Sequence, residues 1–291
     1  AERGLVLDAT FDAAHWDNRS VGSLRTVQTL LDTARIPFLE LRQLLGTRFV
    51  NGGGTLEIDY SVGEGDDAEI ACDLSEARIE ALGQAHLNRI ERFVRLRRKL
   101  GWTVHELDAV LHALGGDLDE AALVNLSFVK RLHEQLGTDL LIIASWFAAL
   151  DTHAYLGDDD ANRPSYYASL FLSRTVGGVD EVAVFEPGAL GAAVIDDHQA
   201  AILAALQIIT AEELALIRAR RLTDDSLSLA NLSEMHRVAT LKRALRISVR
   251  DLLDLLDLTG LDPFDAASLY DALRLSDLLD TIDAAGFSLA E

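Results

Sequence analysis

The sequence has one cysteine, only four prolines, and aromatic side chains at 6% of its 291 positions. The single cysteine, Cys72, excludes an internal disulfide framework. It leaves the cellular compartment open, because a chain of this length can bury a large core without disulfide bridges. With so few prolines, and with alanine, leucine, arginine and acidic residues abundant, the composition predicts a mainly α-helical fold.

Basic residues are far fewer than acidic ones, and long apolar runs are also scarce. The chain has 26 basic and 47 acidic residues, a formal net charge of −21. A field of this sign repels phosphate backbones and anionic lipid headgroups, so we expect neither nucleic acid nor a bare membrane surface as a partner. The longest apolar stretch, Leu140–Leu150, is too short to span a bilayer. Ala1–Thr10 lacks the basic start and the apolar run of a secretory signal.

What the sequence does contain is a recurring signal for the start of a helix. One apolar stripe is formed by residues at three- and four-residue steps: Leu87, Ile90, Phe93, Leu96 and Leu100. Gly101 ends that helix. Thr103-Val104-His105-Glu106 then begins a second one with the pattern of a capping box, in which residues three apart cap each other's backbone N–H groups.

The same start signal recurs at Thr210–Glu213 and Ser248–Asp251, with looser versions at Ile36–Glu40 and Leu136–Leu140. The clearest neighbours lie about 35–40 residues apart, the length of a two-helix unit in helical arrays. Such a unit cannot bury its apolar stripe alone, so the units must stack. We therefore predict one α-helical repeat domain over residues 1–291, an irregular, shell-like array of helical hairpins.

Two stretches interrupt this pattern. Residues 51–73 contain three consecutive glycines and then alternating apolar positions, which predicts a small β-hairpin insertion near residues 55–72. Residues 152–191 contain an acidic triplet, an Arg-Pro turn and a Gly-Gly pair, which predicts an irregular loop excursion. Phe287–Glu291 repeats the helix-start signal, so we expect the chain to be a fragment of a longer one.

The search for metal and cofactor sites gives little. Asp158, Asp160 and Asn162 match the opening of a calcium loop, but Arg163 and Ser169 stand where glycine and glutamate are needed. A solvated acidic turn is the better interpretation. The eight histidines form no cluster with the spacing of metal ligands. We expect no metal and no cofactor.

Catalytic patterns are equally weak, so we predict that the protein is not an enzyme. There is no Gly-x-Ser-x-Gly elbow, and Cys72 has no histidine near it in sequence. Asp251, Asp254 and Asp257 share one helical stripe and could act as paired carboxylates, but in so acidic a chain a solvated helix face is preferred. A basic cluster could bind an anion, or could simply complement a helix end, which we favour: Arg89, Arg92, Arg95, Arg97, Arg98 and Lys99.

Four motifs in order give a family resemblance. Cys72-Asp73-Leu74 is followed by residues 92–103, RFVRLRRKLGWT, which resembles a signature of insecticidal toxin-complex (Tc) A subunits and related virulence-plasmid A proteins. Leu140-Leu141 with Trp146 resembles the family's Leu-Leu-x-Leu-Trp helix, and residues 165–172, SYYASLFL, its Ser-x-Tyr-x-x-Leu-Phe-Leu segment. Arg97 replaces the family tryptophan and Ser173 the usual asparagine, which indicates a divergent member.

The resemblance implies a role in structure. It implies that this region is part of the α-helical shell around a pentameric translocation channel, in a secreted or cell-surface bacterial protein. A homopentameric parent chain, toxin-complex B and C components and a host-cell receptor are the implied partners. The motif positions would then be packing residues and not ligands: Cys72, Phe93, Arg95, Leu96, Gly101, Trp102, Trp146, Tyr167, Leu170 and Phe171.

Two other hypotheses stay open at this point. The chain could be a helical module that binds a protein partner or a host receptor through its acidic faces or through residues 152–191. It could also be an enzyme if folding brings Cys72 together with a histidine and an acid. The leading prediction remains a non-enzymatic scaffold module of a toxin-delivery protein.

Overall fold

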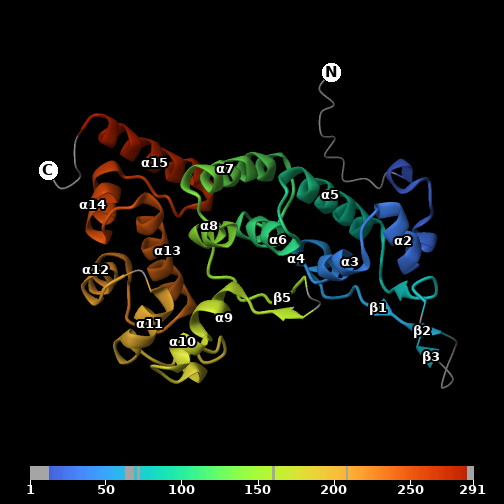
Figure 1. Cartoon of the computed structure of the whole chain (residues 1–291), viewed down its shortest axis with the longest axis horizontal. Coiled ribbons are helices and arrows are strands. Elements are labelled where there is room, and N and C mark those ends of the chain that lie inside the picture. Colours follow the sequence, from blue (N-terminus) through green and yellow to red (C-terminus); the bar gives the residue numbers. More distant parts are fainter. Residues whose placement is uncertain (1–12, 63–68, 71–72, 159–160, 208, 287–291) are drawn as a thin grey trace. The chain divides into compact units, whose positions relative to one another are not determined.

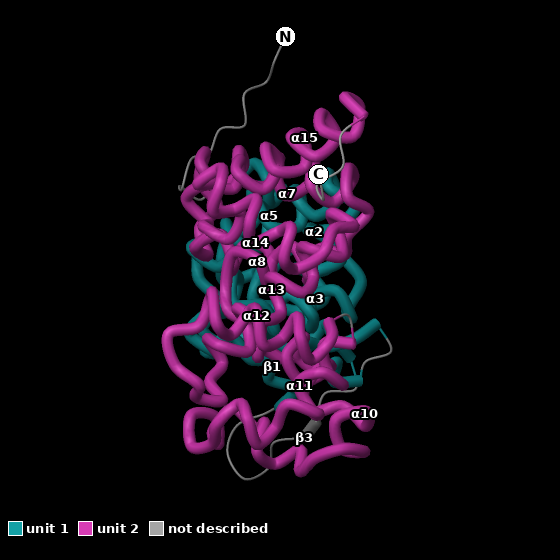
Figure 2. Tube along the Cα trace, turned by 90° about the vertical axis from the view of Figure 1, so that its left-hand side faces the viewer, with its two compact units in different colours: residues 1–108, 155–163 teal, residues 109–154, 164–291 magenta. Residues whose placement is uncertain are grey.

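The computed structural model describes residues 13–62, 69–70, 73–158, 161–207 and 209–286. These residues are mainly helical, with short antiparallel strand pairs, so the predicted fold class is confirmed. The chain divides into two compact units, coloured separately in Figure 2. Unit 1 comprises residues 1–108 and 155–163, and unit 2 comprises residues 109–154 and 164–291. A single repeat domain over the whole chain stays a prediction.

The helices of unit 1 are short except for α5. They are η1 (Ala13–Trp16), α1 (Val21–Leu24), α2 (Val27–Ala34), α3 (Phe38–Leu45), α4 (Arg48–Asn51), α5 (Gln84–Leu100) and the start of α6 (Val104–Ala113). The apolar stripe predicted for α5 faces the core, with Leu87, Ile90 and Phe93 fully buried. Helix α4 packs against α5.

Unit 1 also contains the strands, each two residues long. They are β1 (Ile58–Asp59), β2 (Ser61–Val62), β3 (Glu69–Ile70), β4 (Arg78–Ile79), β5 (Tyr155–Leu156) and β6 (Asn162–Arg163). β2 pairs with β3, and β1 pairs with β4 so that Ile58 lies opposite Ile79. The pairing therefore extends beyond the stretch 55–72 that the sequence indicated. A two-residue strand such as β4 is too short to show the alternation by which strands are predicted.

Unit 2 is helical except for short connections. Its elements are α7 (Glu120–Leu136), α8 (Leu140–Phe147), α9 (Tyr166–Phe171), α10 (Arg174–Gly177), η3 (Val182–Phe185), η4 (Ile195–His198), α11 (Gln199–Leu206), α12 (Ala211–Arg221), α13 (Leu229–Leu245), α14 (Val249–Thr259), η5 (Ala266–Ser268) and α15 (Leu269–Ala284). α13 packs against α8, α12 and α14, and α15 runs beside α7 (Figure 1). α13 is thus a central helix of unit 2, which explains why side chains on most of its circumference are buried.

The start signals define where the helices begin. The Thr210 hydroxyl accepts a hydrogen bond from the Glu213 N–H, and the Glu213 carboxylate accepts one from the Thr210 N–H, which is a complete capping box on α12. The Thr103–Glu106 pair makes the same reciprocal bonds at the start of α6. Ser248 caps α14 through the N–H of Asp251. These local bonds satisfy N–H groups that would otherwise lack a partner.

Residues 152–191 contain more regular structure than an irregular excursion implies. The β5–β6 pair belongs to unit 1, whereas α9, α10 and η3 belong to unit 2. Tyr167, Phe171, Val176 and Phe185 are fully buried. Pro164 follows β6 and Gly177 ends α10, and a helix of four to six residues shows too little periodicity to be predicted.

Candidate functional site

The family-motif residues of α5 lie on two different faces of that helix. Phe93 is fully buried and its ring lies 5.8 Å from that of Phe49, whereas Arg95 is exposed and forms an ion pair with Glu91. Leu96 is half-buried. Gly101 ends the helix with a φ of +76°, a left-handed conformation that glycine adopts without strain. Trp102, at 6% exposure, follows directly and lies two residues before the start of α6.

Arg97, the residue that replaces the family tryptophan, forms a half-buried ion pair. Its Nη2 atom lies 2.8 Å from Oε1 of Glu40 on α3, and the two side chains are 25% and 10% exposed. The Arg97 Nε atom is buried without a hydrogen-bond partner among the described residues. This ion pair joins α5 to α3, and the desolvation of its two charges offsets much of their attraction.

The motif residues of unit 2 form the contacts between neighbouring helices. Trp146 on α8 is fully buried and donates its indole N–H to the hydroxyl of Thr240 on α13 at 2.9 Å. Tyr167 stacks on Phe171 at 5.3 Å, and Phe171 stacks on Phe185 at 5.7 Å. The Tyr167 hydroxyl donates to the Phe185 carbonyl oxygen at 2.6 Å. This aromatic column ties η3 to α9, and a buried hydroxyl with a backbone partner is stable in an apolar site.

Two other motif positions carry less information. Leu170 is half-buried on α9. Cys72 lies outside the described residues, so the hypothesis of a Cys72 nucleophile stays a prediction without a described site.

The strongest candidate for chemistry joins α8, α9 and α13. The buried imidazole of His236 lies between two hydroxyls: its Nδ1 is 3.2 Å from Ser145 Oγ, and its Nε2 is 3.0 Å from the Tyr166 hydroxyl oxygen. The sequence did not point to this group, because its members are separated by up to 91 positions. Seryl, histidyl and tyrosyl groups in contact are the components of a nucleophilic site, so the proton positions decide what this one can do.

The hydrogen bonds leave Ser145 unactivated. The Ser145 hydroxyl donates to the carbonyl oxygen of Ile142 at 2.6 Å, so its oxygen can only accept from His236. Both ring nitrogens of His236 have a hydrogen-bond partner when Nδ1 carries the proton and donates to Ser145, and when Tyr166 donates to Nε2. Burial, with the nearby Arg237 charge, lowers the pKa of His236 to about 3, which keeps the imidazole neutral. A protonated Nδ1 cannot take a proton from serine, so the group is a structural network.

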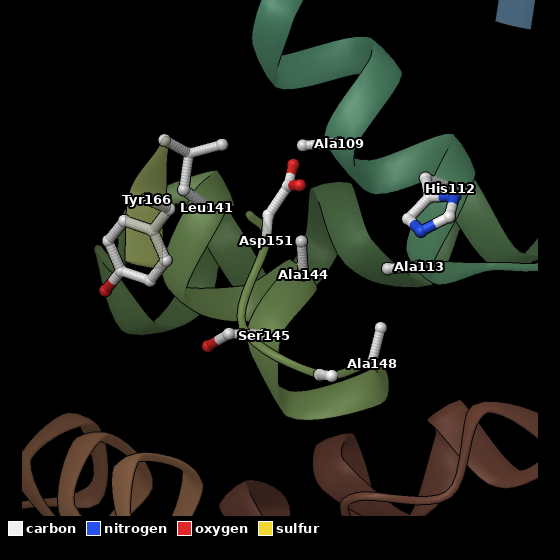
Figure 3. Close-up of a pocket in the computed structure, with 10 residues that line it drawn as sticks. Ala109, His112, Ala113, Leu141, Ala144, Ser145, Ala148, Asp151 and Tyr166 are labelled. Carbon is white, nitrogen blue, oxygen red and sulfur yellow. The ribbon is translucent and has the colours of Figure 1, made fainter. Parts of the chain in front are cut away.

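A small cavity beside this network is too small for a substrate. It is lined by residues of α6, α8 and the segment that leads to α9, including His112, Ser145, Asp151 and Tyr166 (Figure 3). Its volume is about 10 Å³, the space of one water molecule. Burial raises the pKa of Tyr166, and the Asp139 charge adds to the effect, so the phenol stays protonated.

A second buried polar group holds unit 1 together. The carboxylate of Asp108 on α6 is 1% exposed and accepts from the backbone N–H groups of Arg48 and Phe49 at 3.2 and 2.9 Å, at the start of α4. The Tyr155 hydroxyl on β5 also donates to it, at 2.9 Å. Arg48 Nε lies 3.3 Å from the same carboxylate. Each of these partners of Asp108 is a hydrogen-bond donor within the fold. Their donors explain why this carboxylate can be buried.

The other residues considered at the sequence level lie on the surface. Asp254 and Asp257 both contact Arg220 of α12, and Asp251 lies in the cap of α14. Asp158 accepts a hydrogen bond from Gln43. Within the described ranges, no three histidine, cysteine or acidic side chains lie close enough together to hold a metal ion.

Membrane-spanning potential was assessed on the same residues. None of the described helices is both long and apolar enough to cross a bilayer alone. One bent pair, Ile195–Leu206 with Ala211–Arg221, meets the criterion jointly by length and composition, with 112° between its arms.

Comparison with known proteins identifies the fold. Neither the protein-family models nor the curated proteins gave a match to this chain. Among solved structures, the chain is similar to TcdA4 of Morganella morganii, a Tc toxin A subunit, with a TM-score of 0.54 and 17% identity. The match covers 78% of this chain and 10% of TcdA4, so the chain corresponds to a small region of that protein. The resemblance found in the sequence motifs is thereby confirmed at the level of the fold.

Proposed function

We propose that this chain is a non-enzymatic scaffold module, a part of the α-helical shell of a secreted Tc-type toxin A subunit. The observation that carries the proposal is the likeness of fold to TcdA4 over 78% of the chain. On this proposal the parent protein is a homopentamer that works with toxin-complex B and C components and attaches to a host-cell receptor.

The placement of the motif residues supports this role. Trp146, Tyr167 and Phe171 are fully buried between helices, where they fix the position of one helix on the next. A shell has to keep its shape. Large aromatic side chains stabilise that shape, because they provide much contact area with little loss of side-chain entropy. The buried polar groups around His236 and Asp108 are satisfied within the fold. Such groups specify one arrangement of the helices.

The proposal is tested in the polypeptide that contains this chain. Phe171→Ala removes the central ring of the aromatic column, and Tyr270→Ala removes an aromatic side chain that is 52% exposed on α15. Electron microscopy of the purified parent counts assembled pentamers. We expect the Phe171 variant to lower the yield of intact pentamers at least severalfold, and the Tyr270 variant to match the wild type.

Three results would count against it. The parent protein could assemble as something other than a pentamer, or it could assemble normally when residues 13–286 are deleted. The purified chain could also turn over a substrate that the His236→Gln variant does not turn over. The first two outcomes argue against the shell, and the third against a non-enzymatic role.

A further inference from the structure

A surface pocket in unit 1 is unexplained by a role as scaffold. It has a volume of about 260 Å³ and lies where η1, the end of α2 and the face of α5 meet. Apolar side chains form one part of its wall: Trp16, Ala34, Ile90 and Val94. The rest of the wall is polar and consists of Thr33, His15, Glu91 and three arginines.

The pocket has an excess of positive charge. Arg35, Arg95 and Arg98 line it together with one carboxylate, that of Glu91. Glu91 is already paired with Arg95. This excess runs against the composition of a chain with 47 acidic and 26 basic residues. An uncompensated guanidinium cluster next to apolar side chains is a characteristic of sites that recognise an anion.

Some arginines of the protein are each paired with two acidic side chains. Arg218 contacts Asp196 and Asp225, and Arg220 contacts Asp254 and Asp257. Arg35, in contrast, makes no side-chain hydrogen bond or ion pair with any residue in the described part of the chain.

The backbone around Arg35 holds this arrangement in place. Arg35 follows α2 in a left-handed conformation, with a φ of 54°. Nη2 of Arg98 donates to the carbonyl oxygens of Ala34 and Arg35 at 3.2 and 2.6 Å. Arg98 is thereby anchored beside the end of α2, and it lines the pocket together with Arg35. Two guanidinium groups thus line one opening, Arg98 held by backbone carbonyls and Arg35 without a side-chain partner among the described residues.

We propose that this pocket binds a small organic monocarboxylate with an apolar body. Guanidinium groups bind a carboxylate through paired N–H donors, and the wall of Trp16 and Val94 accommodates the apolar part. The volume is close to the lower limit of ligand pockets, about 300–1,000 Å³. The net charge of −21 repels extended polyanions, so a ligand with one negative charge is favoured over a polymer.

The test compares naphthalene-2-carboxylate with the uncharged naphthalene-2-carboxamide by isothermal titration calorimetry on the purified chain. We expect the carboxylate to bind at least about tenfold more tightly, because only the carboxylate carries a negative charge and accepts hydrogen bonds from guanidinium groups through two oxygens. Arg35→Gln should lower the affinity for the carboxylate about tenfold and leave the carboxamide unchanged. This variant should fold, because the Arg35 side chain is exposed and makes no hydrogen bond or ion pair with any described residue. Arg274→Gln, which removes an arginine paired with Asp271 in unit 2, is the matched control and should bind as the wild type does.

Any of four outcomes would overturn the proposal. The carboxylate and the carboxamide could bind equally, Arg35→Gln could leave the carboxylate affinity unchanged, or neither compound could bind at low millimolar concentration. Poly-L-glutamate could also bind while naphthalene-2-carboxylate does not, which would assign the pocket to an acidic protein segment instead. The pentamer count under Proposed function uses different residues and a different readout, so the two proposals fail independently.

Discussion

At the scale of one residue, His236 shows how a titratable side chain serves the packing of this fold and not catalysis. The side chain is 2% exposed on α13, and both ring nitrogens have hydroxyl partners. Burying a neutral imidazole with two hydrogen bonds costs little, whereas burying its charged form is expensive. For that reason burial lowers the pKa of His236 to about 3, with Arg237 adding to the effect.

This residue should make the protein sensitive to acid. The pKa of His236 is about 3 in the folded chain and 6.5 for a free histidine, so between these values the unfolded chain binds a proton that the folded chain does not. The contribution of His236 to stability is therefore complete above about pH 6.5 and is lost as the pH falls towards 3. His236→Gln, which does not titrate, should flatten this part of the pH dependence, measured by urea unfolding at pH 4, 5, 6 and 7.5.

Ser145→Ala is the matched control, because it removes a hydroxyl of the same network but no titratable group and leaves the burial of His236, the main cause of its low pKa, in place. It should keep the slope of the wild type. A His236→Gln profile parallel to that of the wild type between pH 4 and 6.5 would show that His236 binds its proton at an ordinary pKa in the folded chain.

At the scale of the element, the capping boxes decide where helices begin. Glu213 closes the box on α12 and also lies 3.1 Å from Nζ of Lys242 on α13. One carboxylate therefore serves both the start of its own helix and the contact with the next. Such double use is possible because the start of α12 lies against the last turn of α13.

Thr210→Ala should lower the free energy of unfolding by about 1 kcal/mol, since it removes the side-chain acceptor from the capping box of α12. Thr281→Ala provides the comparison. Its hydroxyl donates to the Asp277 carbonyl oxygen on the exposed face of α15 and makes no capping bond, so its loss should change stability by less than about 0.5 kcal/mol. Chemical unfolding followed by circular dichroism measures both. Equal effects of the two substitutions would show that the box does not stabilise α12.

The sequence signals were most informative for elements whose structure is local. The starts of α6, α12 and α14 and the buried stripe of α5 follow from side chains within one or two turns of each other. The short elements of residues 152–191 did not follow in this way. Their aromatic column depends on Phe185, which contacts α9 only after the chain has folded back. This packing also means that deleting the whole segment would expose the core, so surface substitutions are the better way to test it for partner binding.

At the scale of the whole molecule, the excess of 21 negative charges should weaken the folded state at low salt. Raising KCl from 10 to 150 mM shortens the screening length from about 30 to about 8 Å. The thermal midpoint of unfolding should therefore rise over this range, as measured by circular dichroism. A midpoint that stays constant or falls would show that attractive ion pairs outweigh the repulsion.

A charge-reduced variant tests whether repulsion is the cause. Asp280→Asn with Asp283→Asn removes two exposed acids near the end of α15, where negative charge also opposes the helix dipole. The variant should melt above the wild type at 10 mM KCl, and the difference should shrink at 150 mM.

The sequence by itself determined the fold class, the places where the main helices begin and the order of the motifs that indicated a Tc A-subunit fold. These features depend on hydrogen bonds and apolar periodicity within a few residues, which a linear pattern records directly. Only the tertiary structure decided which distant side chains meet. His236 contacts Ser145 and Tyr166 across 91 and 70 positions, and the arginines of the unit 1 pocket come from α5 and from the turn that follows α2. Such contacts arise from how apolar faces pack, and the spacing of residues along the chain carries no record of that packing.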